Sequence, residues 1–276
     1  MKLSVSNIAW AHGERLQAYA LLQRAGITGL EVAPGILFAD EPDVFDPSPD
    51  AARRAIQEIA GAGLQLTSMQ AILFGVEGAA LFGAAEDRAR FDRSMRRAIA
   101  FANRFNIPNL VFGAPRQRVV PQGMPQATAW DLALEQFGPW AKAAQAAGTT
   151  LSVEANPAAY GTNFLNTFGE TLDFVDRLAE PAVKVVLDTG AVRMNQDSFD
   201  LAAVISKIGH VHLSEPLLAP APAEVAPTAA LLNDLAVAGY QRAVSIEMKR
   251  DEAALTTLEG RLSVLATALA KAGLAP

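Results

Sequence analysis

Short β-rich runs alternate with longer amphipathic segments from one end of this 276-residue chain to the other. An alternation of this kind predicts a parallel sheet in which a helix crosses over between consecutive strands. Eight such units fit one closed (β/α)8 barrel of the α/β class, a fold that commonly needs ~250 residues. A doubly wound open sheet is the alternative. We expect the strands at Lys2–Ser6, Gly29–Val32, Gln65–Met69, Asn109–Phe112, Thr150–Glu154, Val183–Asp188, Gly209–Leu213 and Ala243–Glu247.

The helices between these strands are marked by capping signals. Ser48 and Pro49 have the pattern of an N-cap followed by proline at the first helical position. Thr167 and Glu170 have the spacing of a capping box. We expect helices at Arg15–Ala25, Pro49–Gly61, Glu86–Phe105, Thr128–Ala147, Thr167–Leu178, Phe199–Lys207, Thr228–Ala238 and Glu252–Lys271.

No linker, low-complexity stretch or break in composition divides the sequence, so we expect one domain over residues 1–276. The proline-rich segment Pro216–Pro227 would then be a long loop at the catalytic face of the barrel. Met1–Trp10 lacks the apolar core of a signal peptide, and no apolar run approaches the ~18 residues of a membrane span. We therefore expect a cytoplasmic protein without a membrane partner.

Composition restricts the chemistry that the chain can perform. It has no cysteine, which excludes disulfides, thiolate zinc sites and cysteine nucleophiles. Its 23 basic and 29 acidic residues give a net charge of −6, which disfavours a nucleic-acid partner because phosphate backbones require a basic surface. Only three histidines, His12, His210 and His212, are available as soft metal ligands or acid–base groups.

Ligand-type side chains recur at the ends of four consecutive predicted strands. Alternation along each strand directs Glu154, Asp188, His212 and Glu247 into the barrel. In such a barrel the carboxyl ends of all strands meet at one mouth, where catalytic residues lie. Three carboxylates brought together repel one another and resist burial, so a cation is the natural counter-charge.

This donor set suits a divalent ion, with Mn²⁺ or Mg²⁺ favoured by the oxygen-rich ligands and Co²⁺ or Zn²⁺ as alternatives. Each residue taken alone has a simpler interpretation. A carboxylate after a strand commonly caps a helix, and His210 alone is typical of a histidine packed in a core. The hypothesis of a metal site depends on all four strand ends together.

At these residues the sequence resembles the xylose-isomerase-like TIM barrels, and among them the sugar phosphate isomerase/epimerase group that includes ketose 3-epimerases. The resemblance covers essentially the whole chain. It is carried by the segments Val153–Pro157 with Thr162–Thr167, Leu187–Gly190, Ile208–His212 with Glu215, and Ser245–Glu247.

The resemblance implies that Glu154, Asp188, His212 and Glu247 hold one metal ion that chelates a hydroxy-carbonyl sugar or sugar phosphate. It also implies that Glu154 and Glu247 remove and return a proton next to the carbonyl, through an enediolate. Returning the proton to the opposite face epimerises the sugar, and returning it to the neighbouring carbon isomerises it. Proteins of this group often form homodimers.

Three positions depart from the pattern of the group. Ala191, Tyr160 and Leu218 replace a histidine, a substrate-gripping glutamate and an arginine, respectively. Two alternatives follow: a non-catalytic carbohydrate-binding barrel, and a lyase of the inosose-dehydratase type. The related apurinic endonucleases need several more histidines for their zinc ions than this chain has.

Further residues near strand ends are candidates for the substrate pocket. Glu215 is a candidate for orienting His212, since a metal-bound histidine usually donates its other nitrogen to an acceptor. Arg116 and Arg118 are candidates for holding a phosphate or carboxylate. The remaining candidates for substrate contact are Glu31, Trp10, His12, Phe38, Tyr160 and Lys249.

Overall fold

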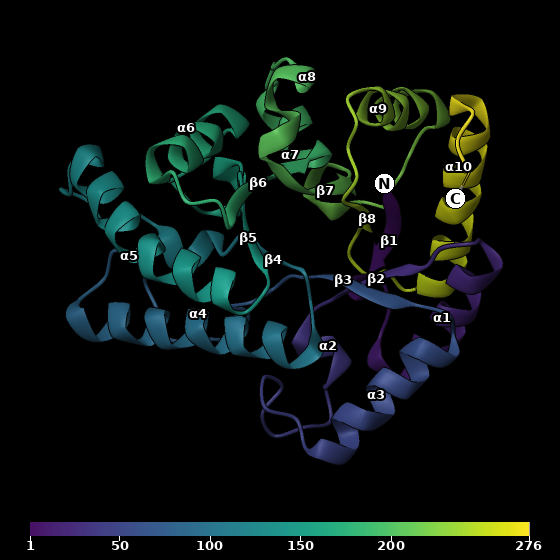
Figure 1. Cartoon of the computed structure of the whole chain (residues 1–276), viewed down its shortest axis with the longest axis horizontal. Coiled ribbons are helices and arrows are strands. Elements are labelled where there is room, and N and C mark those ends of the chain that lie inside the picture. Colours follow the sequence, from purple (N-terminus) through teal and green to yellow (C-terminus); the bar gives the residue numbers. More distant parts are fainter. Residues whose placement is uncertain (276) are drawn as a thin grey trace.

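The computed structural model describes residues 1–275, and its centre is a closed barrel of eight parallel strands (Figure 1). Each strand pairs with the next, and β1 pairs with β8 to close the barrel. The strands are β1 (Lys2–Ser6), β2 (Gly29–Val32), β3 (Gln65–Met69), β4 (Asn109–Phe112), β5 (Thr150–Glu154), β6 (Val183–Asp188), β7 (Ile208–Ser214) and β8 (Ala243–Glu247). The predicted (β/α)8 barrel is confirmed, and the open-sheet alternative is wrong.

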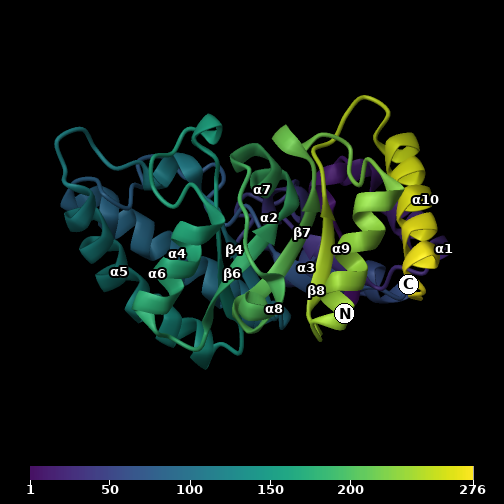
Figure 2. The same cartoon turned by 90° about the horizontal axis from the view of Figure 1, so that it is seen from above.

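Helices surround the barrel and cover the outer face of its strands (Figures 1 and 2). They are α1 (Arg15–Arg24), α2 (Pro34–Leu37), α3 (Pro49–Gly61), α4 (Ala85–Phe105), α5 (Gln126–Ala146), α6 (Phe168–Leu178), α7 (Thr189–Asn195), α8 (Leu201–Val204), α9 (Val225–Val237) and α10 (Ala254–Ala272). The predicted caps are present: the Ser48 side chain accepts a hydrogen bond from the amide of Ala51, and Thr167 and Glu170 form a capping box.

Seven of the eight strands have the predicted bounds, and β7 is longer by one residue at each end. The helices differ more. The helix expected over Phe199–Lys207 forms only as α8 and a following 3₁₀ turn, Ile205–Lys207. The short helices α2 and α7 were not expected, because segments of four and seven residues carry too little periodicity to be recognised.

The two faces of the barrel wall differ in polarity. Between strands and helices lies an apolar layer, in which the ring centroids of Phe91 and Trp140 are 5.4 Å apart. Inside the barrel, polar side chains bond to one another across neighbouring strands. Ser152 donates to Asn109 Oδ1 over 2.6 Å, and Asn109 donates to Ser68 Oγ over 2.9 Å. The polar interior can therefore accommodate the ionisable groups that lie at its carboxyl end.

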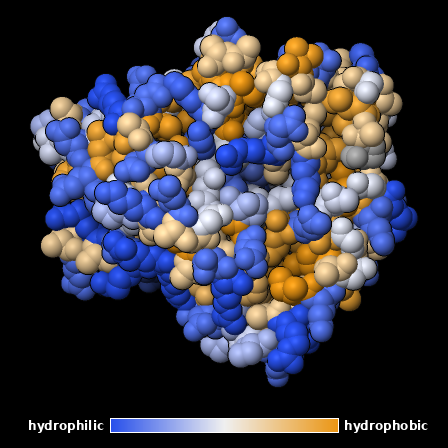
Figure 3. All heavy atoms as spheres, viewed as in Figure 1, coloured by the Kyte–Doolittle hydropathy of each residue, from blue (hydrophilic) through white to orange (hydrophobic). Residues whose placement is uncertain are grey.

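No helix within residues 1–275 is both long and apolar enough to cross a membrane. Figure 3 shows one face of the molecule, on which hydrophobic groups are separated by hydrophilic ones.

Candidate active site

Four strands bring Glu154, Asp188, His212 and Glu247 together at the carboxyl end of the barrel. Each offers one ligand-type atom, and these four atoms lie within 4.8 Å of one another. His212 Nδ1 is at the centre, 2.8 Å from Glu154 Oε1, 3.2 Å from Glu247 Oε2 and 3.7 Å from Asp188 Oδ2. We call these four residues the strand-end cluster. It has the composition and spacing of a candidate metal centre.

Burial makes the charge of the strand-end cluster costly. Burial raises the pKa of Glu247 well above its ordinary value, and the neighbouring Glu154 and Asp188 raise it further. Burial alone would lower the pKa of His212, but the carboxylates of Glu247 and Glu31 raise it well above the usual value. Three carboxylates share a single imidazole, so a bound cation would relieve their repulsion. The donor set therefore fits a divalent ion.

Asp188 combines a structural role with a free oxygen. Its Oδ1 caps α7 by accepting the amide of Ala191 over 2.6 Å, and it also accepts from Ser214 Oγ over 2.8 Å. Its Oδ2 is the atom that faces His212. The helix-capping interpretation and the ligand interpretation are thus compatible, because each uses a different oxygen.

Glu154 is held from two sides. Asn156 Nδ2 donates to its Oε2 over 3.0 Å, while Oε1 faces His212. Arg118 is fully buried behind it and donates to the backbone oxygens of Glu154 and Leu165. Burial lowers the pKa of Arg118 to about 10, so its guanidinium stays charged at neutral pH and lies among the groups that surround Glu154. Arg118 therefore supports the strand end rather than contacting substrate.

Gly113, just after β4, leaves room for the Glu154 carboxylate. A Cβ at this position would lie 2.7 Å from Glu154 Oε2, which is too close for a non-bonded contact. Gly113→Ala is expected to displace the carboxylate and to lower cation affinity and turnover about 10- to 100-fold. Isothermal titration with Mn²⁺ measures the affinity. Gly138→Ala in α5 is the control, because its Cβ would meet nothing within 4 Å; equal losses in both variants would contradict the assignment.

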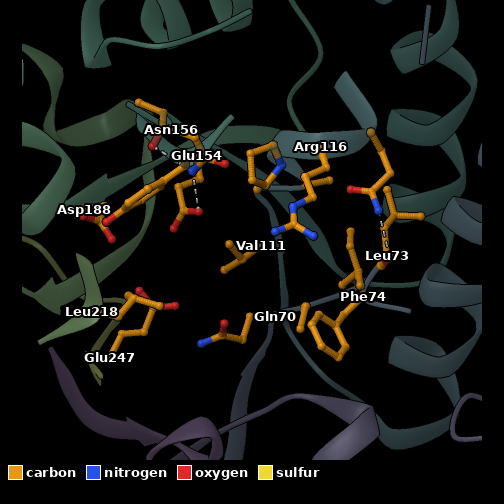
Figure 4. A pocket seen from close by; sticks show the side chains of 18 of the residues that line it. Gln70, Leu73, Phe74, Val111, Arg116, Glu154, Asn156, Asp188, Leu218 and Glu247 are labelled. Atoms are coloured by element: carbon orange, nitrogen blue, oxygen red, sulfur yellow. Dashed lines mark hydrogen bonds between the residues drawn. The ribbon is translucent and has the colours of Figure 1, made fainter. Parts of the chain in front are cut away.

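A cavity of about 440 Å³ opens onto the strand-end cluster (Figure 4). Glu154, Asp188 and Glu247 form one side of it. The segment Gln70–Gly75 after β3 and the segment Gly113–Gln117 after β4 form the other side, which is largely apolar. The cavity therefore joins a carboxylate-rich end to an apolar wall that carries few polar groups.

Two of the predicted substrate-contact residues line this cavity, Arg116 and Tyr160, together with Leu218, one of the three departures. The Tyr160 hydroxyl accepts the amide of Leu217 over 3.1 Å, which ties the loop after β7 to the cavity wall. Ala191, the third departure, is buried at the start of α7, and its amide donates a hydrogen bond to the capping residue Asp188.

Other predicted pocket residues lie elsewhere. Trp10 and Phe38 are buried among aromatic rings, with Trp10 edge-on to Tyr19. His12 lies between the Ile36 carbonyl, 2.8 Å from Nδ1, and Asp40, 3.3 Å from Nε2. Lys249, another candidate for substrate contact, is exposed and does not line the cavity. These side chains follow loop paths that alternation along a strand does not predict.

Glu215 does not orient His212. One of its oxygens pairs with Arg193, and the other accepts the amide of Ala223 over 3.1 Å. The group that faces the second nitrogen of His212 is Glu31, which is completely buried inside the barrel and does not line the cavity. The predicted roles of Glu215 and Glu31 are therefore corrected: Glu215 braces the loop after β7, and Glu31 contacts the histidine.

Three polar residues of the cavity were not predicted as site residues: Gln70, Gln117 and Asn156. Gln70 directly follows β3, so the strand-end rule that found the cluster would also have found it. Asn156 is buried, and its Oδ1 has no hydrogen-bond partner among the described residues. That oxygen is therefore available to accept a hydrogen bond from a ligand hydroxyl.

The fold and the strand-end cluster define a TIM-barrel protein with a carboxylate-rich candidate metal centre at the mouth of the barrel. A sequence model of the xylose isomerase-like TIM barrel family matches residues 19–268, and the chain belongs to that family. No curated protein sequence matches this chain.

Several solved structures share the barrel. D-Psicose 3-epimerase from Clostridium cellulolyticum H10 is 18% identical with a TM-score of 0.76, covering 99% of this chain and 98% of that one. A 3-keto-D-glucoside 4-epimerase from E. coli is 17% identical with a TM-score of 0.75, covering 97% and 99%. A family 2 AP endonuclease from Brucella melitensis is 18% identical with a TM-score of 0.69, covering 94% and 97%.

Proposed function

We propose that this protein is a divalent-metal-dependent isomerase or epimerase of sugars or sugar phosphates. The observation that carries the proposal is the strand-end cluster, three carboxylates and one imidazole within 4.8 Å of one another and open to a cavity of about 440 Å³. The epimerases among the solved structures of the same fold support this choice of reaction.

Glu154, Asp188, His212 and Glu247 are the residues that would hold the ion. Mn²⁺ or Mg²⁺ fits the oxygen-rich set best, and Co²⁺ or Zn²⁺ is the second choice. When bound, the ion would polarise the substrate carbonyl and offset the negative charge of the enediolate, which makes the neighbouring C–H acidic enough to lose its proton.

Glu154 and Glu247 are the proposed proton-transfer groups. Both line the cavity, and they come from β5 and β8, which β6 and β7 separate in the barrel. A carboxylate that lines the cavity can hold a proton between its removal and its return. One oxygen of Asp188 caps α7, so we assign Asp188 as a metal ligand and not as a proton-transfer group.

Solvent exchange tests the proposal. The Mn²⁺-loaded protein is incubated in D₂O with a panel of ketoses and their phosphates, and NMR detects deuterium on the carbon next to the carbonyl. Exchange with formation of the epimer or isomer is the expected result. Sugar binding without any exchange would instead indicate a non-catalytic carbohydrate-binding barrel, and release of water would indicate a dehydratase.

Arg116 suggests that the substrate carries an anionic group. Its guanidinium points into the cavity (Figure 4), and it forms no hydrogen bond or ion pair with any residue from 1 to 275. Leu73 and Phe74 line the cavity on the same side as Arg116, and the three lining carboxylates lie on the opposite side (Figure 4). A phosphate or carboxylate on the substrate would supply the missing partner.

Arg116→Ala is expected to raise KM for a phosphorylated or carboxylated substrate about 10- to 100-fold, the value of a hydrogen bond to a charged group, with little change in kcat. Steady-state kinetics on the most active anionic sugar and its neutral counterpart measure the effect. Arg53→Ala on α3 is the control, because Arg53 pairs with Asp50 on the protein surface. An unchanged KM for the anionic sugar would contradict this role.

A further inference from the structure

A second ionisable group lies beneath the strand-end cluster, inside the barrel. Glu31, on β2, is 0% exposed and lies against His210 and His212 of β7. The two histidine rings are edge-on, with centroids 4.9 Å apart. Glu31 does not line the cavity, and it contacts a predicted metal ligand, His212, without being one of the four residues of the strand-end cluster.

The Glu31 carboxylate is surrounded by donors. Gln70 Nε2 donates to its Oε1 over 2.9 Å, and Ser245 Oγ lies 3.3 Å from the same oxygen. His212 Nε2 is 3.2 Å from both oxygens. His210 Nε2 lies 2.8 Å from Oε2, without the geometry of a hydrogen bond. A carboxylate with this many donors accepts hydrogen bonds only, and it has no proton to give to His212.

The two nitrogens of His212 consequently have different surroundings. Nε2 faces Glu31, and Nδ1 faces Glu154, Glu247 and Asp188. A neutral imidazole carries one proton, and the proton stays on the nitrogen that has the acceptor, which leaves the other nitrogen with a lone pair. Glu31 is the acceptor that remains at Nε2 when the other three carboxylates are engaged with a cation.

We propose that Glu31 is a positioning residue that holds the Nε2 proton of His212, so that Nδ1 presents its lone pair to a cation at the strand-end cluster. This inference rests on the proposed metal site but not on the choice of substrate. A carboxylate behind a ligating histidine orients the ring and increases its basicity. Gln70 extends the arrangement, because it lines the cavity and donates to both Ser6 and Glu31.

Glu31→Gln tests the role of the charge. A glutamine keeps the size of the side chain but offers one acceptor oxygen and places an NH₂ group against the histidines, so Mn²⁺ binding is expected to weaken about 10- to 100-fold. Isothermal titration measures the affinity, and circular dichroism checks the fold. Ser245→Ala is the matched control, since it removes one donor from Glu31 and leaves the acceptor in place. Glu31→Gln binding Mn²⁺ as tightly as the wild type would overturn the proposal.

A measurement on the wild-type protein avoids any folding defect. With ¹⁵N-labelled histidine and a diamagnetic ion, Zn²⁺ or Mg²⁺, NMR reports which nitrogen of His212 carries the proton. Protonated Nε2 with unprotonated Nδ1 is expected, and a proton on Nδ1 would overturn the assignment. The chain has three histidines, so His12→Gln and His210→Gln are enough to assign the signals.

Metal titrations can refute the metal site and the positioning role of Glu31 separately. A wild-type protein that binds none of Mn²⁺, Mg²⁺, Co²⁺ and Zn²⁺ refutes the metal site and the role of Glu31 with it. A wild-type protein that binds Mn²⁺ but whose affinity is unaffected by Glu31→Gln refutes the positioning role and leaves the metal site standing.

Discussion

Replacing Glu247 by glutamine is expected to reduce solvent exchange at the substrate carbon by about 10²- to 10⁴-fold, the usual contribution of a positioned acid–base group. Glutamine has nearly the same shape but neither accepts nor returns a proton. The buried carboxylate with a raised pKa is the group on β8 that faces both His212 and the cavity. The rate of deuterium incorporation, followed by NMR in D₂O, measures the loss.

Two comparisons make this result specific. Glu154→Gln is expected to cause a loss of the same order, because one glutamate removes the proton and the other returns it. Glu252→Gln, an exposed carboxylate beyond the end of β8, is the control and is expected to retain full activity. Exchange at the wild-type rate in Glu247→Gln would show that the proton is taken by another group.

The second large effect concerns the ion. Adding Mn²⁺ to metal-free protein at 100 times its Kd is expected to stabilise the fold by about 2.7 kcal/mol and to raise Tm by roughly 5–10 °C. Chelation by EDTA reverses the shift. His212→Asn is expected to abolish the stabilisation by Mn²⁺, because Nδ1 of His212 lies within 3.7 Å of an oxygen of each of the three carboxylates. Differential scanning calorimetry with and without Mn²⁺ measures both shifts.

The metal-free stability of the variants separates loss of binding from misfolding. Burial raises the pKa of Glu247, so its stabilising contribution is present at low pH and is lost as the pH rises through that pKa. At neutral pH a neutral glutamine avoids this cost, and metal-free Glu247→Gln should be at least as stable as the wild type. A variant that keeps its Tm but no longer responds to Mn²⁺ has lost the site rather than the fold. Stabilisation by Mn²⁺ in His212→Asn equal to that of the wild type would contradict the proposed ligand set.

The sequence predicted the architecture because the signals for it are local. Seven strand bounds and two helix caps follow from β propensity, turn residues and capping pairs within a few positions of each other. Short helices such as α7 lack such a signal, since Asp188 caps it through a side chain that could equally belong to a ligand.

The four residues of the strand-end cluster could also be predicted from the sequence. Strand alternation determines which side chains face inward, and closure of a parallel barrel brings all carboxyl ends to one mouth. The proximity of these four residues can therefore be predicted without knowing the conformations of the loops. Gln70 was accessible by the same rule, although it was not recognised.

Only the tertiary structure decided which partners the remaining polar side chains contact. Glu31 and His212 are 181 positions apart in the chain and meet across the barrel interior. Glu215 pairs with Arg193 instead of the nearby histidine, and Arg118 is buried while Arg116 points into the cavity. These outcomes depend on the paths of loops and on contacts across the barrel, which arise from packing of the whole chain rather than from a local pattern. The sequence by itself determined the barrel and the four residues at its mouth; the folded structure decided which carboxylate stands behind the histidine.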